Sequence, residues 1–292
     1  MKNFKKLALM GLTAVMSLSL LAACGGGNSG SAETPANNTE TPSVENTETP
    51  AASGEFTTVE AGKLIMSTNA QFPPYEMVGD GEGYEGTGYE GIDVEIAYAI
   101  AQKLGLELVV DNMGFDAALQ AVQTGKSDIV MAGVTVTGDR LEVMDFSDTY
   151  ANGIQVVIVP ENSDIATIDD LEGKLIGCQM GTTGYIYCSD TPENGGYGED
   201  AVIPYDDGAA AIQALMNGQV DCVVIDNAPA QEYVKANPGL KILDTEFANE
   251  NYAIGFAKGN TALKDAVNAA LIELVEDGTV QSIIDKYIPA EG

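Results

Sequence analysis

A helix-to-strand pattern occurs twice in this chain, and the repetition constrains the fold more than any other feature. Residues 118–133 align with residues 211–226 without a gap. In each copy, apolar residues at helical spacing stop at a glycine, Gly125 or Gly218, and a short apolar run follows. A helix that leads into a buried strand is typical of parallel sheets covered by helices. The two copies therefore predict two lobes of similar build.

Strand-like and helix-like segments alternate through the chain from residue 55 onward. We therefore expect an α/β fold with two lobes, each a sheet with helices on both faces. The expected strands cover residues 63–69, 106–110, 127–133, 155–160, 173–180 and 221–227. The expected helices cover residues 91–104, 115–125 and 208–218, with two more runs between 261 and 287 that are broken at Gly278.

The N-terminal segment has the pattern of an export signal. Lys2, Lys5 and Lys6 precede an apolar stretch at residues 7–23, and the stretch ends in Leu21-Ala22-Ala23-Cys24. A basic head, a short apolar body and small residues before a cut site describe a secretory signal. A membrane-spanning helix usually needs about 20 apolar residues, so an uncleaved anchor is the weaker alternative. We therefore predict a signal peptide at residues 1–23.

The tetrad that ends at Cys24 resembles the bacterial lipobox. This resemblance implies a lipidated Cys24, with acyl chains such as palmitate, and contact with the membrane through that anchor alone. Residues 24–54 continue as a glycine-rich stretch and then Glu-Thr-Pro repeats with almost no apolar side chains. Such a segment cannot bury enough surface to order itself, so we expect a disordered linker.

The chain contains a single arginine, Arg140, beside 44 acidic residues and no histidine. A guanidinium matches a carboxylate with two parallel hydrogen bonds. Arg140 follows the first repeat's strand end at Gly133, and Asp226 occupies the equivalent strand end in the second repeat. Because ligands of open parallel sheets bind beyond the carboxyl ends of the strands, we expect both groups to face one cleft and suit a zwitterion. A structural salt bridge from Arg140 to Asp139 or Glu142 is the alternative.

The balance of charge excludes some partners and some chemistry. A net charge of −31 does not favour nucleic acid. Without histidine, ordinary serine or cysteine triads are excluded. The sequence also lacks a metal-ligand motif and a cofactor loop. We therefore expect a binding protein, without cofactor, metal or catalytic residue.

A series of motifs in order resembles the extracellular solute-binding proteins of family 3, which capture polar amino acids for ABC importers. The resemblance implies a type II periplasmic-binding-protein-like fold, with lobe 1 at residues 55–151, lobe 2 at 152–250 and a return to lobe 1 at 251–292. It also implies two crossover strands, an L-amino acid ligand and an ABC permease as partner, and we expect a monomer outside the cytoplasm. The motifs are Phe72–Tyr75, Gly91–Leu104, Arg140 with Asp145–Tyr150, Gly181–Gly184 and Asp221–Asp226.

The same resemblance assigns roles to individual residues. Arg140 would pair with the ligand α-carboxylate, assisted by the backbone N–H of Thr135 and by the N–H and hydroxyl of Thr183. Asp226 would bind the α-ammonium with the Gly133 carbonyl and the Thr135 hydroxyl. The ligand side chain would meet one aromatic wall and three amides, namely Phe72, Asn69, Gln71 and Gln179.

Some acidic residues allow more than one interpretation. Relatives that take cationic amino acids often place an acid where Asn69 stands, so Asn69 disfavours lysine or arginine as ligand. An enzyme of the dehydratase kind on the same fold, acting on a cyclic amino or keto acid, is the alternative function, with Glu76 as general acid. Asp93 and Glu95 are expected to cap a helix and to stabilise its dipole rather than to catalyse.

The cysteines of the second lobe also leave two possibilities. Cys178 and Cys222 fall in buried-strand patterns, where a free thiol behaves as a small apolar residue. We therefore expect buried thiols, and a bridge between Cys178 and Cys188 is the alternative.

Overall fold

The computed structural model describes residues 56–289, which belong to one compact unit. The predicted signal peptide, Cys24 and the linker at residues 24–54 lie outside the described residues. A search of residues 56–289 finds no helix that is both long and apolar enough to cross a membrane.

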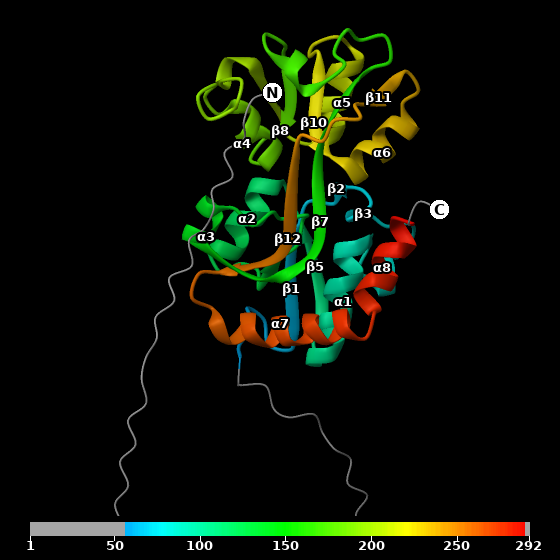
Figure 1. The fold of residues 1–292 in the computed structure, drawn as a ribbon. Coiled ribbons are helices and arrows are strands. Elements are labelled where there is room, and N and C mark those ends of the chain that lie inside the picture. Colours follow the sequence, from blue (N-terminus) through cyan, green and yellow to red (C-terminus); the bar gives the residue numbers. More distant parts are fainter. Residues whose placement is uncertain (1–55, 290–292) are drawn as a thin grey trace, which may run out of the picture. The chain divides into compact units, whose positions relative to one another are not determined.

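Lobe 1 is built on a parallel sheet with helices around it (Figure 1). β1 (Lys63–Thr68) lies between β5 (Glu107–Asn112) and β6 (Ile129–Val130), and both pairs are parallel. A small antiparallel sheet contains β2 (Gln71–Phe72), β3 (Glu76–Val78) and β4 (Tyr89–Glu90), beside the 3-10 turn η1 (Tyr84–Gly86). The helices are α1 (Ile92–Leu104), α2 (Phe115–Gln123), α3 (Gly138–Val143), α7 (Thr261–Glu276) and α8 (Thr279–Tyr287).

Lobe 2 repeats this build. β8 (Ile176–Gln179) lies between β9 (Val202–Tyr205) and β10 (Cys222–Asp226), again in parallel. β11 (Leu240–Ile242) pairs antiparallel with the end of β7 (Met144–Pro160). The helices and 3-10 turns are α4 (Thr183–Ser189), α5 (Gly208–Met216), α6 (Asn227–Ala236), η2 (Ile168–Leu171) and η3 (Glu199–Ala201).

Two long antiparallel strands join the lobes. β7 has 17 residues and β12 (Ala248–Ala257) has 10, and they run side by side between the lobes (Figure 1). At about 3.3 Å per residue, β7 spans roughly 55 Å, enough to pair in both lobes. The two sheets are therefore continuous, as one nine-stranded sheet in the order β5-β1-β6-β12-β7-β10-β8-β9 with β11 beside β7. Asn152 pairs with Asn251, at the two predicted crossovers.

The sequence repeat is also a structural repeat. Val130 packs in one core cluster with α2, and the equivalent Val223 packs in one cluster with α5. Their neighbours Ile129 and Cys222 belong to the clusters on the opposite faces, as the alternation of side chains along a strand requires. Each predicted strand and helix corresponds to an observed element.

The two aspartates that begin the repeated strands have the same role. The Asp128 carboxylate accepts a hydrogen bond from the Ile65 N–H at 2.7 Å. The Asp221 carboxylate accepts one from the Leu175 N–H at 2.8 Å. Each carboxylate therefore ties the start of its strand to the neighbouring parallel strand.

Asp93 and Glu95 lie in the first turn of α1, as predicted, but the prediction that they cap the helix is wrong. The N-cap of α1 is Gly91, and no side chain caps it. Asp93 and Glu95 are both buried because they face into the lobe: Asp93 accepts a hydrogen bond from the Gly133 N–H at 3.0 Å, and Glu95 contacts Lys286 and Tyr287 on α8. These acids join distant elements instead of closing their own helix.

The cysteines of lobe 2 are buried free thiols. Cys178 on β8, Cys188 on α4 and Cys222 on β10 are fully buried in one apolar cluster. The hydrogen bond to the neighbouring Cys178 thiol, together with burial, raises the pKa of Cys188 well above its ordinary value, and burial raises the pKa of Cys222. The expectation of buried thiols is confirmed, and the bridge between Cys178 and Cys188 is not formed.

Replacement of Gly153 by alanine should destabilise the joining strands. A Cβ atom on Gly153 would lie 2.3 Å from the hydroxyl oxygen of Tyr252, a fully buried side chain. Overpacking of this kind typically costs about 1–3 kcal/mol, and urea unfolding would measure it. Gly138→Ala is the control, because its Cβ would meet nothing within 4 Å. Equal stability of the two variants would contradict the close approach.

Candidate functional site

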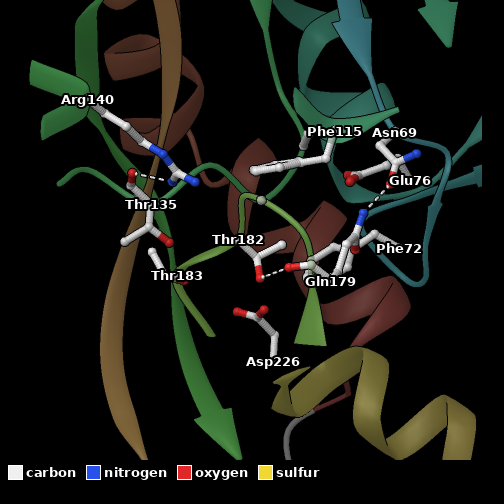
Figure 2. Close-up of a pocket in the computed structure, with 12 residues that line it drawn as sticks. Asn69, Phe72, Glu76, Phe115, Thr135, Arg140, Gln179, Thr182, Thr183 and Asp226 are labelled. Atoms are coloured by element: carbon white, nitrogen blue, oxygen red, sulfur yellow. Dashed lines mark hydrogen bonds between the residues drawn. The ribbon is translucent and has the colours of Figure 1, made fainter. Parts of the chain in front are cut away.

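Twelve residues line a cavity between the two lobes (Figure 2). The residues predicted from the sequence to bind a ligand are among them, namely Asn69, Phe72, Gly133, Thr135, Arg140, Gln179, Thr183 and Asp226. The remaining lining residues are Glu76, Phe115, Ala132 and Thr182.

The cavity lies where parallel strands of both lobes end. Asn69 follows β1, and Gly133 comes shortly after β6. Gln179 and Asp226 are the last residues of β8 and β10. The carboxyl ends of parallel strands are where open sheets bind their ligands, so the folds of the two lobes bring these polar groups together.

Arg140 is buried, and backbone carbonyls hold its guanidinium. Nη1 donates to the Thr135 carbonyl at 2.8 Å (Figure 2). Nη2 donates to the Gly181 carbonyl at 3.2 Å. The guanidinium carbon lies 5.4 Å from the ring centre of Phe115. Within residues 56–289, Arg140 forms no ion pair within 4.0 Å, so the predicted alternative of a salt bridge to Asp139 or Glu142 is wrong. A guanidinium has five donors, and three remain for an anion.

Asp226 supplies a carboxylate to the same cavity. It ends β10 and is buried, and the Tyr252 hydroxyl donates to its Oδ1 atom. Burial and the nearby Glu250 carboxylate raise the pKa of Asp226 well above its ordinary value. A cation placed beside Asp226 would offset both effects.

Glu250 contacts a residue that lines the cavity, and no sequence pattern singled it out. It lies on β12 and is buried, and its Oε2 atom accepts hydrogen bonds from the Thr135 hydroxyl at 2.9 Å and the Gln155 amide at 3.1 Å. The Thr135 hydroxyl is therefore a donor to Glu250, while its oxygen can still accept. Glu250 was not predicted because a single acid belongs to no periodic pattern. Its position next to Asn251, at a predicted crossover, was the one indication that it lies near the cleft.

Several hydrogen bonds cross between the lobes, so the structure is closed. The Gln179 amide donates to the Asn69 side-chain oxygen at 3.0 Å (Figure 2). The Tyr233 hydroxyl donates to the carbonyl of Gln71, whose side chain is exposed, at 3.2 Å. Gly181 has a φ of +75°, and a Cβ atom on it would lie 1.8 Å from the Asp116 carboxylate of lobe 1. Because Gly181 has no side chain, lobe 2 can approach Asp116 of lobe 1 this closely in the closed structure.

Two buried acids, Glu76 and Asp93, interact with each other, and Glu76 of the pair lines the cavity. Burial is the main cause that raises the pKa of Asp93, to about 6. Burial and the neighbouring Asp93 also raise the pKa of Glu76 well above its ordinary value. The Tyr150 hydroxyl belongs to the same buried group.

The family model of the bacterial extracellular solute-binding proteins, family 3, matches residues 64–290 of the sequence. The chain therefore belongs to this family. It is 34% identical over 236 residues to the probable histidine-binding protein of Neisseria gonorrhoeae, across 79% of this chain and 85% of that protein. It is 31% identical over 233 residues to the arginine-binding extracellular protein ArtP of Bacillus subtilis (strain 168), across 78% of this chain and 87% of that protein.

Solved structures show the same architecture. ArtJ, the arginine-, lysine-, histidine-binding protein of Geobacillus stearothermophilus, is 32% identical with a TM-score of 0.70, across 79% of this chain and 96% of that one. An ancestral arginine-binding protein bound to arginine is 39% identical with a TM-score of 0.69, across 78% and 98%. The fold is thus the type II periplasmic-binding-protein fold that the sequence predicted. The family and these relatives are solute-binding proteins, not enzymes, so the dehydratase alternative is not favoured.

Asp93→Asn should reduce the pH dependence of stability. Because the folded-state pKa of Asp93 is about 6 against 3.8, its contribution is full below pH 4 and is lost as the pH rises through 6. The loss is worth about 3 kcal/mol at neutral pH, and the asparagine cannot ionise. Urea unfolding at pH 4 and pH 7 should therefore show a smaller fall for the variant. Glu193→Gln, an exposed carboxyl, is the control, and an unchanged fall in Asp93→Asn would contradict the assignment.

Proposed function

We propose that this protein captures an L-amino acid between its lobes and delivers it to an ABC importer. The observation that carries the proposal is the pair of buried opposite charges, Arg140 and Asp226, that line one cavity. Within residues 56–289, neither group forms an ion pair within 4.0 Å. Buried charges are costly unless paired, and a zwitterion would pair both at once. Relatives named for histidine, arginine and cystine support this class of ligand.

The carboxylate end of the ligand binds to Arg140. Its guanidinium is already oriented by the carbonyls of Thr135 and Gly181, so the remaining donors are presented in a fixed geometry. A carboxylate can accept two parallel bonds from such a fork. The backbone N–H of Thr135 and the N–H and hydroxyl of Thr183, which both line the cavity, assist it.

The ammonium end binds to Asp226, with the Gly133 carbonyl and the Thr135 hydroxyl oxygen as further acceptors. The Tyr252 hydroxyl donates to Asp226, and the Glu250 carboxylate holds the Thr135 hydroxyl proton. These bonds orient the acceptors before the ligand arrives. Phe72 forms a wall of the cavity for the ligand side chain.

The protein works at the outer face of the membrane as a monomeric lipoprotein. Removal of the signal peptide at residues 1–23 leaves Cys24 as the lipidated N-terminus, and the anchor keeps the lobes near the permease. The lipobox-like tetrad before Cys24 supports this proposal. Two acyl chains suffice for stable anchoring, whereas one does not.

A thermal-shift panel of the twenty amino acids tests the proposed function. A ligand at 100 times its Kd stabilises the native state by about 2.7 kcal/mol, so a binding amino acid should raise the Tm. Arg140→Lys should weaken that binding by about 2 kcal/mol or more, since a buried charged hydrogen bond is truncated. Unfolding without ligand controls for the integrity of the variant. A panel without any shift, or full affinity in Arg140→Lys, would contradict the proposal.

Gly181→Ala should impair closure around the ligand. The alanine Cβ would clash with the Asp116 carboxylate, and alanine at φ +75° is strained. Both effects act at the contact between the lobes. The affinity should therefore fall at least tenfold, which corresponds to about 1.4 kcal/mol, because binding is completed by lobe closure. Calorimetry measures the affinity, and Gly181→Ala with Asp116→Ala should recover part of it by removing the contact. No recovery in the double variant would place the effect in the backbone alone.

A further inference from the structure

Glu250 is a buried acid that receives hydrogen bonds from three separate segments of the chain. It lies on β12 and is 4% exposed. Its Oε2 atom accepts from the Thr135 hydroxyl at 2.9 Å and from the Gln155 amide at 3.1 Å. The Tyr187 hydroxyl of α4 also hydrogen-bonds to Glu250. One carboxylate of a joining strand thus orients donors from lobe 1, from β7 and from lobe 2.

The bond to Glu250 decides which way the Thr135 hydroxyl points. A carboxylate only accepts hydrogen bonds, so Thr135 is the donor of this pair. The single hydroxyl proton is then committed to Glu250, while the hydroxyl oxygen can still accept. Because Thr135 lines the cavity, it presents an acceptor to the ligand rather than a donor (Figure 2).

Gln155 connects Glu250 with Asp226. Gln155 of β7 pairs with Asp226 of β10 in the sheet, and its side chain is buried. Its amide donates to Glu250 and also hydrogen-bonds to Asp226. An amide nitrogen carries two hydrogens, which is enough for both carboxylates. Glu250 is therefore linked by hydrogen bonds to both side chains proposed to accept from the ligand ammonium, Thr135 and Asp226.

The charge of Glu250 acts on both charged groups of the proposed amino-acid site. Burial lowers the pKa of Arg140, and Glu250 is the foremost of the nearby groups that oppose this change. Burial and Glu250 raise the pKa of Asp226. A ligand ammonium would offset the repulsion between Glu250 and Asp226. A ligand with a carboxylate and no ammonium would instead add another negative charge.

We propose that Glu250 is a positioning residue through which the site selects an α-ammonium group over an α-hydroxyl group. This inference rests on the proposed function and adds a residue that controls its specificity. Glu250 is not one of the twelve described residues that line the cavity, so it acts on the ligand through Thr135. A 2-hydroxy acid has the carboxylate that Arg140 binds, but its neutral hydroxyl brings one proton to a set of acceptors that suits the three of an ammonium.

Calorimetry with an amino acid and its 2-hydroxy analogue tests the proposal. The probes are the amino acid that gives the largest Tm shift in the panel of twenty and the 2-hydroxy acid with the same side chain, for example L-histidine with imidazolelactic acid. The wild type should prefer the amino acid. Glu250→Gln should reduce this preference by about tenfold or more, the usual loss for a hydrogen bond to a charged group. The glutamine is neutral and has one oxygen in place of two, so it cannot hold all three donors as the carboxylate does.

A matched control separates this role from the loss of any buried acid. Glu95→Gln removes a carboxyl that is also 4% exposed but contacts Lys286 and Tyr287 instead of the lining of the cavity. This variant should keep the preference of the wild type. A preference that falls equally in Glu95→Gln and Glu250→Gln would overturn the assignment to Glu250.

A double-mutant cycle shows whether Glu250 acts through Thr135. Thr135→Val removes the hydroxyl, so it should reduce the preference by itself, and this measurement does not require that Glu250→Gln folds. In the Thr135→Val background, Glu250→Gln should change the preference less than it does with Thr135 in place. Fully additive effects, or an unchanged preference in Thr135→Val, would overturn the action through Thr135.

The ratio of the two affinities distinguishes a positioning role from a structural one. A structural defect lowers the affinity for both ligands alike, so an unchanged preference in Glu250→Gln would overturn this inference. The proposed function would then stand, because an amino acid still binds. Binding of no amino acid in the panel would overturn both.

Discussion

The pairing of β7 with β12 is the interaction on which the rest of the structure depends. It makes one continuous sheet from the sheets of two lobes, so the lobes keep a common frame across the cavity. The same strands also hold residues that line the cavity, because Glu250 and Tyr252, which lie opposite Gly153 and Ala151 in the ladder, bond to Thr135 and Asp226. The Tyr252 hydroxyl reaches Asp226, which ends a strand of lobe 2. The strands that join the lobes therefore also orient polar groups that line the cavity.

The second constraint is electrostatic. Four buried carboxyl groups lie in or beside the cavity, and the positive charge among its lining residues comes from Arg140. Burial of like charges is costly, and the protein meets part of that cost by raising carboxyl pKa values. In the closed protein, the buried carboxyl groups in and beside the cavity thus outnumber the positive charge of Arg140. These carboxyl groups are Glu76, Asp93, Asp226 and Glu250.

The sequence predicted the parts of the fold that depend on local periodicity. The repeat located two equivalent strand ends, and those ends bring Arg140 and Asp226 to one cavity. The sequence did not predict that β7 begins at Met144, because the polar first half of this strand has no alternating pattern. It also missed Glu250, and it assigned Asp93 to its own helix. These groups depend on contacts between segments far apart in the chain, which no local pattern records.

The three thiols of lobe 2 have a consequence for the life of an exported chain. The family is extracellular, where disulfides form readily, yet Cys178, Cys188 and Cys222 remain reduced inside the core. The thiolate is the reactive species, and burial raises the pKa of Cys188 and Cys222. Protection from oxidation is therefore conferred by folding itself and lasts only while lobe 2 stays closed around its core. After export, the three thiols can form disulfides until lobe 2 has folded. The rate at which lobe 2 folds therefore determines whether they stay reduced.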